Sequence, residues 1–418
     1  MTEDRTADCR RRGDCRACGS TRLSSFLDLG AQPPANALLR SSDEFATERR
    51  FPLEVFLCEA CGLVQLLDVV DPELLFGHYL YLTGTSSTMR RHFDDYAAAA
   101  LEGLQDPAAA LVVEVASNDG SLLSSFATRG AAVLGIEPAR NVARIARDRG
   151  IETISEFFDL AVARRIRAAR GTAALAVANN VLAHVDDARG FLEGLAHLVG
   201  EEGRVIVEVP WVAELFRRLE YDTIYHEHLS YFSIGALMVL FRSAGLSIAE
   251  VRHQTVHGGS LRVIAVSRRR LPEHDAAVGA AADREAAEGL NSLAAWIEFA
   301  GRVRENRRRL VELVDSRLRA GRRVAAYGAP AKGNTLLNFA GLGGERLQFT
   351  VDRNPLKSGR FLPGTHIPVL APEAIEERKP DDLLILPWNI AEEIIEQESG
   401  HRARGGCFLV PIPEPRVL

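Results

Sequence analysis

Long apolar runs are missing from this 418-residue sequence. No run approaches the roughly 20 residues that cross a bilayer as a helix, so we expect no membrane-spanning segment. The first residues, MTEDRTADCRRRGDC, are charged and contain no apolar stretch of the roughly 7–15 residues that a signal peptide needs. These two absences predict a cytoplasmic protein, in which cysteines stay reduced.

An excess of basic residues is also lacking, because 50 Lys and Arg face 56 Asp and Glu and give a formal net charge of −6. The sequence therefore has no electrostatic footprint for nucleic acid, and we assign the triplets RRR at 268–270 and 307–309 to solvated helical faces. Nothing in the sequence indicates an obligate partner chain, so a monomer is the expectation. The length predicts two or three domains.

Cysteine is scarce, with six in the chain, but four of them form two pairs in CRAC (15–18) and CEAC (58–61). Each C-x-x-C knuckle turns two thiolates toward one point, and four thiolates complete a closed tetrahedral zinc site with no open position for water. The alternative is a redox pair, which would follow a strand and open a helix in a βαβ pattern. Neither knuckle does so. We predict one structural zinc ion in a domain over residues 1–75, held by Cys15, Cys18, Cys58 and Cys61.

The stretch ALVVEVASNDGSLLSSFATRGAAVLGIE (110–137) is typical of a nucleotide-binding parallel sheet. It predicts a strand, a tight loop ending in Gly120, a helix, and a second strand ending in Glu137, whose carboxylate can accept from two ribose hydroxyls. The G-x-G-x-x-G of dinucleotide sites is absent, and the loop has two carboxylates, Glu114 and Asp119. Carboxylates repel phosphates and suit a cationic ligand, so we predict S-adenosylmethionine rather than a dinucleotide.

The segment ALAVANNVLAHVDD (174–187) predicts another buried strand, which ends in Asn179 and Asn180 and leads into a loop with His184. Ligands of open parallel sheets lie outside the carboxyl ends of the strands, so these three side chains are placed on the cofactor side. For His184 alone, a helix-capping region without a ligand is the alternative. The unit predicts a methyltransferase-type domain over residues 76–256.

The stretch YDTIYHEHLSYF (221–232) concentrates imidazole, carboxylate and phenol groups. It is not the helical zinc-protease motif, because the position four residues after His226 is Ser230 rather than a second histidine. An acid/base centre is then the better interpretation. In an extended backbone His226 and His228 would point to opposite faces, and we assign the structural role to His226.

The last third contains RRVAAYGAPAKGNTLLNFAG (322–341), which predicts a strand, a glycine loop with Lys332, and a helix. The G-K-[ST] ending of a phosphate loop is absent, so a hydrolysed triphosphate is not expected, whereas a lysine with loop amides suits a sugar diphosphate. The alternative is a packing domain whose loop only completes the cleft. The segment HGGS (257–260) either lines a sugar pocket or forms a turn between domains.

Taken together, the double C-x-x-C module, VVEVASNDGS, ANNVLAHVDD, TIYHEHLSYFS, HGGSLRV and YGAPAKGNTLLN resemble the deoxysugar C-methyltransferases of antibiotic biosynthesis. These enzymes methylate a carbon of nucleotide-linked 3-keto or 4-keto sugars, and the resemblance covers nearly the whole chain in order. It implies an α/β protein with three parts: an N-terminal zinc-binding module, a central Rossmann-like class I S-adenosylmethionine domain, and a C-terminal α/β Rossmann-like domain over residues 257–418 that helps to hold a dTDP-sugar.

The resemblance also implies residue roles. In relatives the histidine that ends the Y-x-E-H pattern is the general base and the tyrosine and glutamate before it assist, which here gives His228, Tyr225 and Glu227. A tyrosine just after the zinc domain also lies in relatives' active sites. Its best match is Tyr79, with Tyr81 as the alternate.

Methylation of carbon needs a carbon nucleophile, which an aldose carbon becomes only next to a ketone. Our hypothesis is that His228 removes the α proton, since a near-neutral pKa favours histidine over carboxylate, and that the enolate carbon then attacks the methyl group. A neutral donor such as Tyr225, Tyr79 or His184 would stabilise the enolate oxygen. Glu227 either orients an imidazole or binds a sugar amine or hydroxyl. The expected acceptor is C-3 of a 4-keto sugar; the alternatives are a sugar O- or N-methyltransferase and a non-catalytic nucleotide-sugar-binding protein.

The site residues predicted in this way form three groups. The catalytic group is His228, Tyr225, Glu227, Tyr79 and His184. The cofactor-binding group is Tyr81, Ser87, Glu114, Ala116, Asn118, Gly120, Glu137, Pro138, Asn179 and Asn180, with Ala116 at a loop position that is often glycine in methyltransferases. The substrate-binding group is His257, Ser260, Lys332, Asn334 and Arg353.

Overall fold

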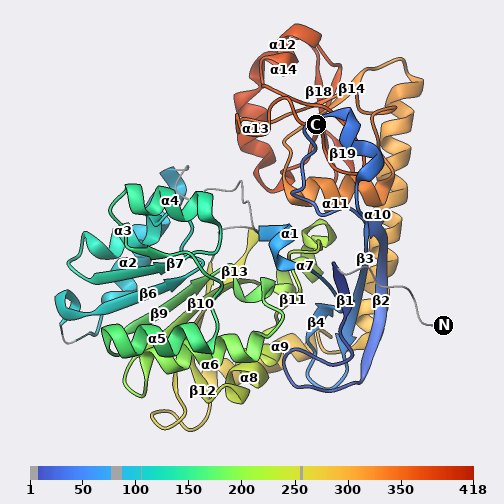
Figure 1. Cartoon of the computed structure of the whole chain (residues 1–418). Coiled ribbons are helices and arrows are strands. Elements are labelled where there is room, and N and C mark those ends of the chain that lie inside the picture. Colours follow the sequence, from blue (N-terminus) through green and yellow to red (C-terminus); the bar gives the residue numbers. More distant parts are fainter. Residues whose placement is uncertain (1–7, 77–86, 105, 255–257) are drawn as a thin grey trace.

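The computed structural model describes residues 8–76, 87–104, 106–254 and 258–418. The described chain forms an N-terminal module, a central α/β part and a C-terminal α/β part (Figure 1). This arrangement confirms the predicted fold class. Across these four ranges, every helix is too short or too polar to cross a bilayer.

The N-terminal module is built on a four-stranded antiparallel sheet in the order β11-β4-β3-β2. Three of these strands come from the module itself, whereas β11 (Ser230–Tyr231) follows the YHEH segment of the central part. The carboxyl side of that segment is thus fixed by main-chain hydrogen bonds to the N-terminal module. The remaining strands are β2 (Leu23–Gln32), β3 (Phe51–Cys58) and β4 (Val64–Leu66), with β1 (Cys9–Arg11) and β5 (Asp68–Val70) as a separate antiparallel pair.

The central sheet has seven strands in the order β12-β13-β10-β9-β6-β7-β8, of which the last five are parallel. Its strands are almost wholly apolar because helices cover both faces, with α2, α3 and α4 on one face and α5, α6 and α8 on the other (Figure 1). The strands are β6 (Leu111–Val115), β7 (Ala132–Ile136), β8 (Thr153–Ile154), β9 (Leu175–Asn179), β10 (Arg204–Pro210), β12 (Leu246–Gln254) and β13 (Ser260–Ser267). The helices are α2 (Ser87–Leu101), α3 (Ser121–Ala127), α4 (Arg140–Asp148), α5 (Leu160–Arg170), α6 (Ala188–Val199), α7 (Val212–Arg218) and α8 (Ile234–Ser243).

The predicted boundary at residue 256 falls between two neighbouring strands of this sheet. β13 pairs antiparallel with both β12 and β10, although the sequence division places it in the C-terminal part. Helix α9 (Ala276–Ala287) then packs against α8 and β12. The sheet pairing therefore extends the central part beyond the point where the sequence pattern changes.

The C-terminal part has a six-stranded sheet in the order β16-β15-β14-β17-β18-β19, parallel except for β19. Helix α11 (Ala331–Ala340) follows β14 (Val324–Tyr327), as the strand, glycine loop and helix pattern predicts. The other strands are β15 (Thr350–Val351), β16 (Val369–Leu370), β17 (Asp382–Ile385), β18 (Cys407–Val410) and β19 (Arg416–Val417), and the other helices are α12 (Ala374–Arg378), α13 (Ala391–Gln397) and α14 (Ser399–Ala403).

The 27-residue helix α10 (Leu293–Arg319) joins the central and C-terminal parts and runs along β2 (Figure 1). Near its start, fully buried Trp296 contacts Phe26 and Phe216, each with ring centroids 5.0 Å apart. Large aromatic side chains dominate the energetics of such cores, so this contact ties residues of all three regions into one hydrophobic cluster. A short helix, α1 (Pro72–Phe76), lies between the parts.

Candidate active site

A cavity of about 840 Å³ lies where the three parts meet. This volume falls within the usual range for small-molecule sites. Its wall includes the carboxyl ends of β6, β7, β9 and β10, which is the ligand side of an open parallel sheet. Helix α1, the 225–231 segment and the loop that precedes α11 complete the wall.

The loop after β6 is held in an unusual conformation beside this cavity. Ala116, Asn118 and Gly120 have φ values of 56°, 49° and 74°. Left-handed backbone costs an L residue other than glycine roughly 1–2 kcal/mol, and such strain gathers at functional sites. Glu137 fixes the loop, because its carboxylate accepts the N–H of Asn118 at 3.0 Å and the N–H of Ala139 at 2.8 Å. A carboxylate has about four acceptor positions, so Glu137 keeps capacity for ligand hydroxyls.

The two loop carboxylates differ in their surroundings. Asp119 is fully buried, lies 2.9 Å from the guanidinium of Arg149, and does not contribute to the cavity wall. Glu114 does line the cavity, and its Oε2 has no hydrogen-bond partner. Burial, with the nearby carboxylates of Asp119 and Glu137, raises the pKa of Glu114 well above its usual range. An unpartnered buried carboxyl fits a ligand that brings a positive charge, as S-adenosylmethionine does.

The end of β9 adds polar groups to the same region. Asn179 Oδ1 accepts a hydrogen bond of 3.2 Å from Tyr96 Oη, and the N–H of Asn180 donates to the Glu208 carbonyl at 2.7 Å. Asn180 also has a positive φ of 53°. Both asparagines line the cavity, as do Ser117 and Pro138.

The YHEH segment forms a turn, since the N–H of His228 donates to the Tyr225 carbonyl at 2.8 Å. The expectation of an extended backbone here was wrong. The two histidines nevertheless have different surroundings. His226 Nε2 lies 3.1 Å from the Phe51 carbonyl of β3 and is absent from the cavity wall, whereas His228 lines the cavity.

The hydrogen bonds of His228 define its tautomer. Nδ1 lies 2.9 Å from the Thr223 carbonyl and Nε2 lies 2.9 Å from Tyr225 Oη. Because a carbonyl can only accept, the proton resides on Nδ1 and the bare Nε2 accepts from the tyrosine. Burial lowers the pKa of His228 to about 4, so the imidazole is neutral at pH 7. The ring therefore presents an unprotonated nitrogen together with a phenol.

A second neutral imidazole stands next to this pair. The rings of His184 and His228 are 4.8 Å apart and nearly perpendicular, at 83°. Burial lowers the pKa of His184 well below its usual range, with a smaller contribution from His228. His184 Nδ1 has no hydrogen-bond partner, and its ring also contacts Phe76 of α1. The structure thus brings His184 beside the YHEH segment, although forty-odd residues separate them in sequence.

Glu227 occupies the same wall and is 2% exposed. Its Oε1 accepts a 2.6 Å hydrogen bond from Asn36 Nδ2, and its Oε2 has no partner. Burial raises the pKa of Glu227 to about 7. Its observed partner is therefore an amide of the N-terminal module rather than an imidazole. No sequence spacing points to Asn36, because the contact joins segments almost two hundred residues apart.

Lys332 is one of several residues of the C-terminal part that line the cavity. Its Nζ donates to Asn389 Oδ1 and lies 5.0 Å from the Trp388 ring centroid. Burial lowers the pKa of Lys332, while the carboxylates of Asp222 and Glu220 oppose this change. Lys357, which donates to the Ala329 carbonyl at 2.9 Å, also lines the cavity.

Three of the predicted substrate residues do not reach the cavity wall. Asn334 is buried and donates to the Ala35 carbonyl at 2.6 Å, which links α11 to the N-terminal module. Arg353 is exposed and donates to Gln397 at 3.0 Å, and Ser260 is buried in β13. Their substrate assignments find no support in this geometry. His257, Tyr79 and Tyr81 lie outside the described residues, and Ser87 is the first residue of α2.

Other cavity residues escaped the sequence analysis. Glu208, at the carboxyl end of β10, lies 2.9 Å from Arg262 and 3.4 Å from His92. Burial raises the pKa of Glu208, but its ion pairs outweigh burial and hold the pKa below its usual range. Its position at the carboxyl end of a strand is the sequence signal that could have identified it as a cavity residue. Ser230 and Tyr231 line the cavity from β11, where the pairing with β4 could not be foreseen.

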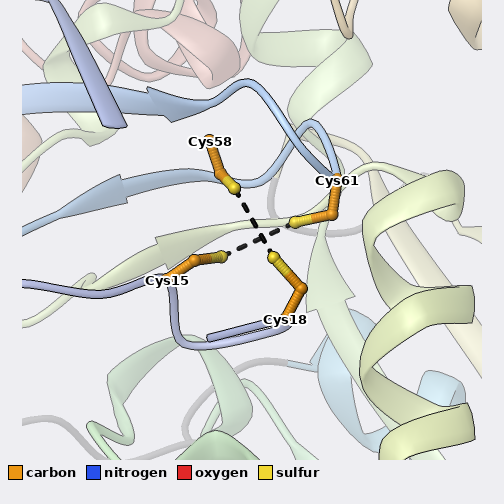
Figure 2. Close-up of side chains that lie close together, drawn as sticks. All are labelled: Cys15, Cys18, Cys58 and Cys61. Carbon is orange, nitrogen blue, oxygen red and sulfur yellow. Dashed lines mark hydrogen bonds between the residues drawn. The ribbon is translucent and has the colours of Figure 1, made fainter. Parts of the chain in front are cut away.

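The four cysteines of the two knuckles converge, as Figure 2 shows. Their sulfur atoms all lie within 4.8 Å of one another, with Cys15–Cys61 and Cys18–Cys58 at 3.6 Å. A zinc ion with Zn–S bonds of about 2.3 Å in a tetrahedron requires sulfurs about 3.8 Å apart, so the cluster fits zinc. Each knuckle closes on a glycine with positive φ, Gly19 and Gly62, whose N–H groups donate to Cys15 and Cys58 carbonyls.

Known proteins match this architecture along the chain. Family models described as "Putative zinc binding domain", "Methyltransferase domain" and "C-methyltransferase C-terminal domain" match residues 15–76, 88–251 and 255–413. C-methyltransferase NovU of Streptomyces niveus is 39% identical over 405 residues, which are 97% of this chain and 96% of NovU. The chain belongs to this C-methyltransferase family. It is a methyltransferase that uses S-adenosylmethionine, and its cysteine cluster lies in the family's zinc-binding domain.

Solved structures resemble the methyltransferase only in part. Magnesium protoporphyrin IX methyltransferase of Synechocystis PCC 6803 is 19% identical, with 43% of this chain and 83% of that chain covered and a TM-score of 0.35. The mitomycin 7-O-methyltransferase MmcR is also 19% identical, with 43% and 54% covered and a TM-score of 0.34.

The cysteine cluster predicts a clear metal dependence. We expect Cys58→Ser to lose the bound zinc, from roughly one ion per chain to almost none, and to unfold at a lower temperature, because metal binding contributes to folding. Cys407→Ser, outside the cluster, should keep its zinc. Elemental analysis and thermal unfolding measure both effects. Full zinc occupancy in Cys58→Ser would exclude the cluster as the zinc site.

The raised pKa of Glu227 predicts a change of stability with pH. Its pKa rises from 4.5 to about 7 on folding, so the folded protein binds the proton more tightly, and the stability gained below pH 4.5 is lost as pH rises through about 7. We therefore expect Glu227→Gln to gain stability relative to wild type across this window, by at most about 3 kcal/mol. Urea unfolding at several pH values measures the difference. Glu396→Gln, at an exposed position of α13, is the control, and a stability difference for Glu227→Gln that does not change with pH would contradict the assignment.

Proposed function

We propose that this C-methyltransferase deprotonates a dTDP-linked deoxyketosugar at the carbon next to its ketone, with C-3 of a 4-keto sugar as the assigned acceptor, and methylates the enolate. The observation that carries the proposal is the Tyr225–His228 pair, whose oriented imidazole has an unprotonated Nε2 in the cavity wall. A general base must be unprotonated at working pH and held within reach of the proton that it removes, and His228 fits both conditions. Its pKa of about 4 nevertheless makes the imidazole a weaker base than the near-neutral histidine that the sequence analysis expected.

The first step is transfer of the sugar's α proton to His228 Nε2. In the present arrangement that nitrogen accepts from Tyr225 Oη, so the phenol leaves Nε2 as the proton arrives. The released phenol can then donate to the oxygen that gains charge in the enolate. His184, held neutral 4.8 Å from His228, supplies a second donor that adds no positive charge before the reaction begins.

S-Adenosylmethionine supplies an electrophilic methyl group on a sulfonium, so the C–C bond forms as the C–S bond breaks. The residues of this chain that suit its binding lie at the strand ends: Glu114 with an unpartnered oxygen, Glu137 with spare acceptor capacity, and the left-handed loop from Ala116.

The sugar nucleotide is assigned to the part of the wall that the C-terminal part supplies. Lys332 and Lys357 bring two positive charges to the cavity and suit a diphosphate, and Asp222 and Glu220 help Lys332 to stay charged despite burial. Glu227 Oε2 is free to accept from a sugar hydroxyl or amine, and Asn36 holds the other carboxylate oxygen in place. The bond from Asn36 favours this role over orientation of an imidazole.

Proton exchange tests the enolate mechanism directly. In heavy water without methyl donor, wild-type protein should exchange the α proton of a dTDP-ketosugar, and His228→Asn should exchange it about 10²–10⁴-fold more slowly while S-adenosylmethionine still binds. The control His197→Asn, on α6, should behave as wild type. Mass spectrometry of a panel of dTDP-ketosugars identifies the acceptor and the product. Exchange that persists in His228→Asn would overturn the proposal.

Removal of the buried lysine tests the diphosphate site. We expect Lys332→Met to raise KM for the dTDP-sugar by roughly 10–100-fold, the range expected when a charged hydrogen bond is lost, and to leave S-adenosylmethionine affinity unchanged. Lys379→Met, at the end of α12, is the matched control. Thermal unfolding checks that the variant stays folded although Asp222 and Glu220 have lost the neighbouring ammonium group of Lys332. An unchanged KM would place the diphosphate elsewhere.

A further inference from the structure

We infer that Arg16 is a positioning residue for methyl transfer, because it joins the four-cysteine cluster to the two loops that carry His184 and His228. This inference rests on the proposed role of His228. Arg16 lies inside the first knuckle, between Cys15 and Cys18, and its side chain has no exposed surface. A fully buried arginine is rare unless it is paired; here Nε and Nη1 have partners, whereas Nη2 has none.

The Arg16 guanidinium reaches away from the cysteines toward the cavity wall. Its Nε lies 3.1 Å from Asp186 Oδ1, and its Nη1 contacts the carbonyls of Leu66 and, at 3.4 Å, Leu229. The side chain of Gln65 completes the arrangement, because its Oε1 accepts from both the Arg16 main chain at 3.2 Å and Nη1 at 3.3 Å.

Two of these acceptors belong to the histidine loops. Leu229 directly follows His228, and Asp186 is the second residue after His184. The loops also touch each other, since the Leu229 N–H donates to the Ala183 carbonyl at 2.7 Å. One buried side chain therefore contacts both segments whose imidazoles stand 4.8 Å apart.

The main chain strengthens the connection. β11, which begins one residue after Leu229, pairs with β4, and β4 begins three residues after Cys61 of the second knuckle. Both knuckles thus lead into the contacts that hold the YHEH turn. Zinc at the cluster would fix the backbone on either side of Arg16, so the metal contributes to alignment of the catalytic loop although it lies outside the cavity wall.

The geometry requires a guanidinium rather than a single positive charge. Arginine presents several N–H groups in a planar fork, whereas the lysine ammonium is a compact point charge on a flexible stem and cannot match acceptors in several directions. Arg10 and Arg12 also approach Asp186, but their side chains are 64% and 19% exposed. Arg10 provides a natural control, since it pairs with the same carboxylate from the surface.

Kinetics of Arg16→Met and Arg10→Met test the inference. We expect Arg16→Met to retain its zinc and its S-adenosylmethionine affinity. Its kcat and its rate of α-proton exchange, each divided by the concentration of protein that binds S-adenosylmethionine, should fall about 10²-fold, since a misplacement of a catalytic group by about 1 Å costs this much. KM for the dTDP-sugar should change little. Arg10→Met should stay within about twofold of wild type.

Two further variants keep the test decisive. Should Arg16→Met lose zinc or fail to fold, Arg16→Lys takes its place and should retain charge and zinc yet lower kcat, because it restores only one of the contacts. Asp186→Asn should lower kcat without loss of zinc. Normal kcat in folded Arg16→Lys or Arg16→Met would overturn the inference.

The outcome for His228→Asn separates this inference from the proposed function. If His228→Asn abolishes exchange while folded Arg16→Met behaves as wild type, the proposed base stands and the role of Arg16 is wrong. If His228→Asn still exchanges the proton, the proposed function fails whatever the arginine variants show.

Discussion

Burial of ionisable side chains at the junction of the three parts is the constraint on which this site depends. Burial disfavours every charged form, so it keeps His228 and His184 neutral and raises the pKa values of Glu227 and Glu114. A base that must accept a proton from carbon has to be unprotonated before it acts, and a neutral donor must remain protonated. In the proposed mechanism desolvation keeps the base and the donor in these forms, and it also lowers the basicity of the His228 imidazole.

That burial depends on contacts between distant segments. The cavity wall is formed by the N-terminal module through Asn36, by the central sheet through its strand ends, and by the first turn of α11 through Lys332. Helix α10 and the cluster around Trp296 hold these parts together. None of the three could form the site alone, which explains why a zinc-stabilised module accompanies a methyltransferase sheet that has its own core.

The sequence predicts what local spacing controls. Strand, loop and helix around Gly120 and Lys332 follow from hydrophobic runs and turn residues, and two C-x-x-C knuckles converge because each turns its thiolates inward. Contacts between segments far apart are different. The pairing of β11 with β4 and the bond from Asn36 to Glu227 have no local signature, and the 225–228 turn formed where alternation suggested an extended chain.

The unpartnered polar atoms of the cavity wall connect stability to function. Glu114 Oε2, His184 Nδ1 and Glu227 Oε2 are buried without a hydrogen-bond partner in the protein, and a buried polar group that is left unsatisfied costs about 1–3 kcal/mol. Ligands that donate or accept at these atoms remove the cost on binding, so the bound protein is more stable than the free one. A fully satisfied cavity would be more stable but would have nothing left to recognise a ligand. Binding can therefore recover part of the stability that these three atoms cost.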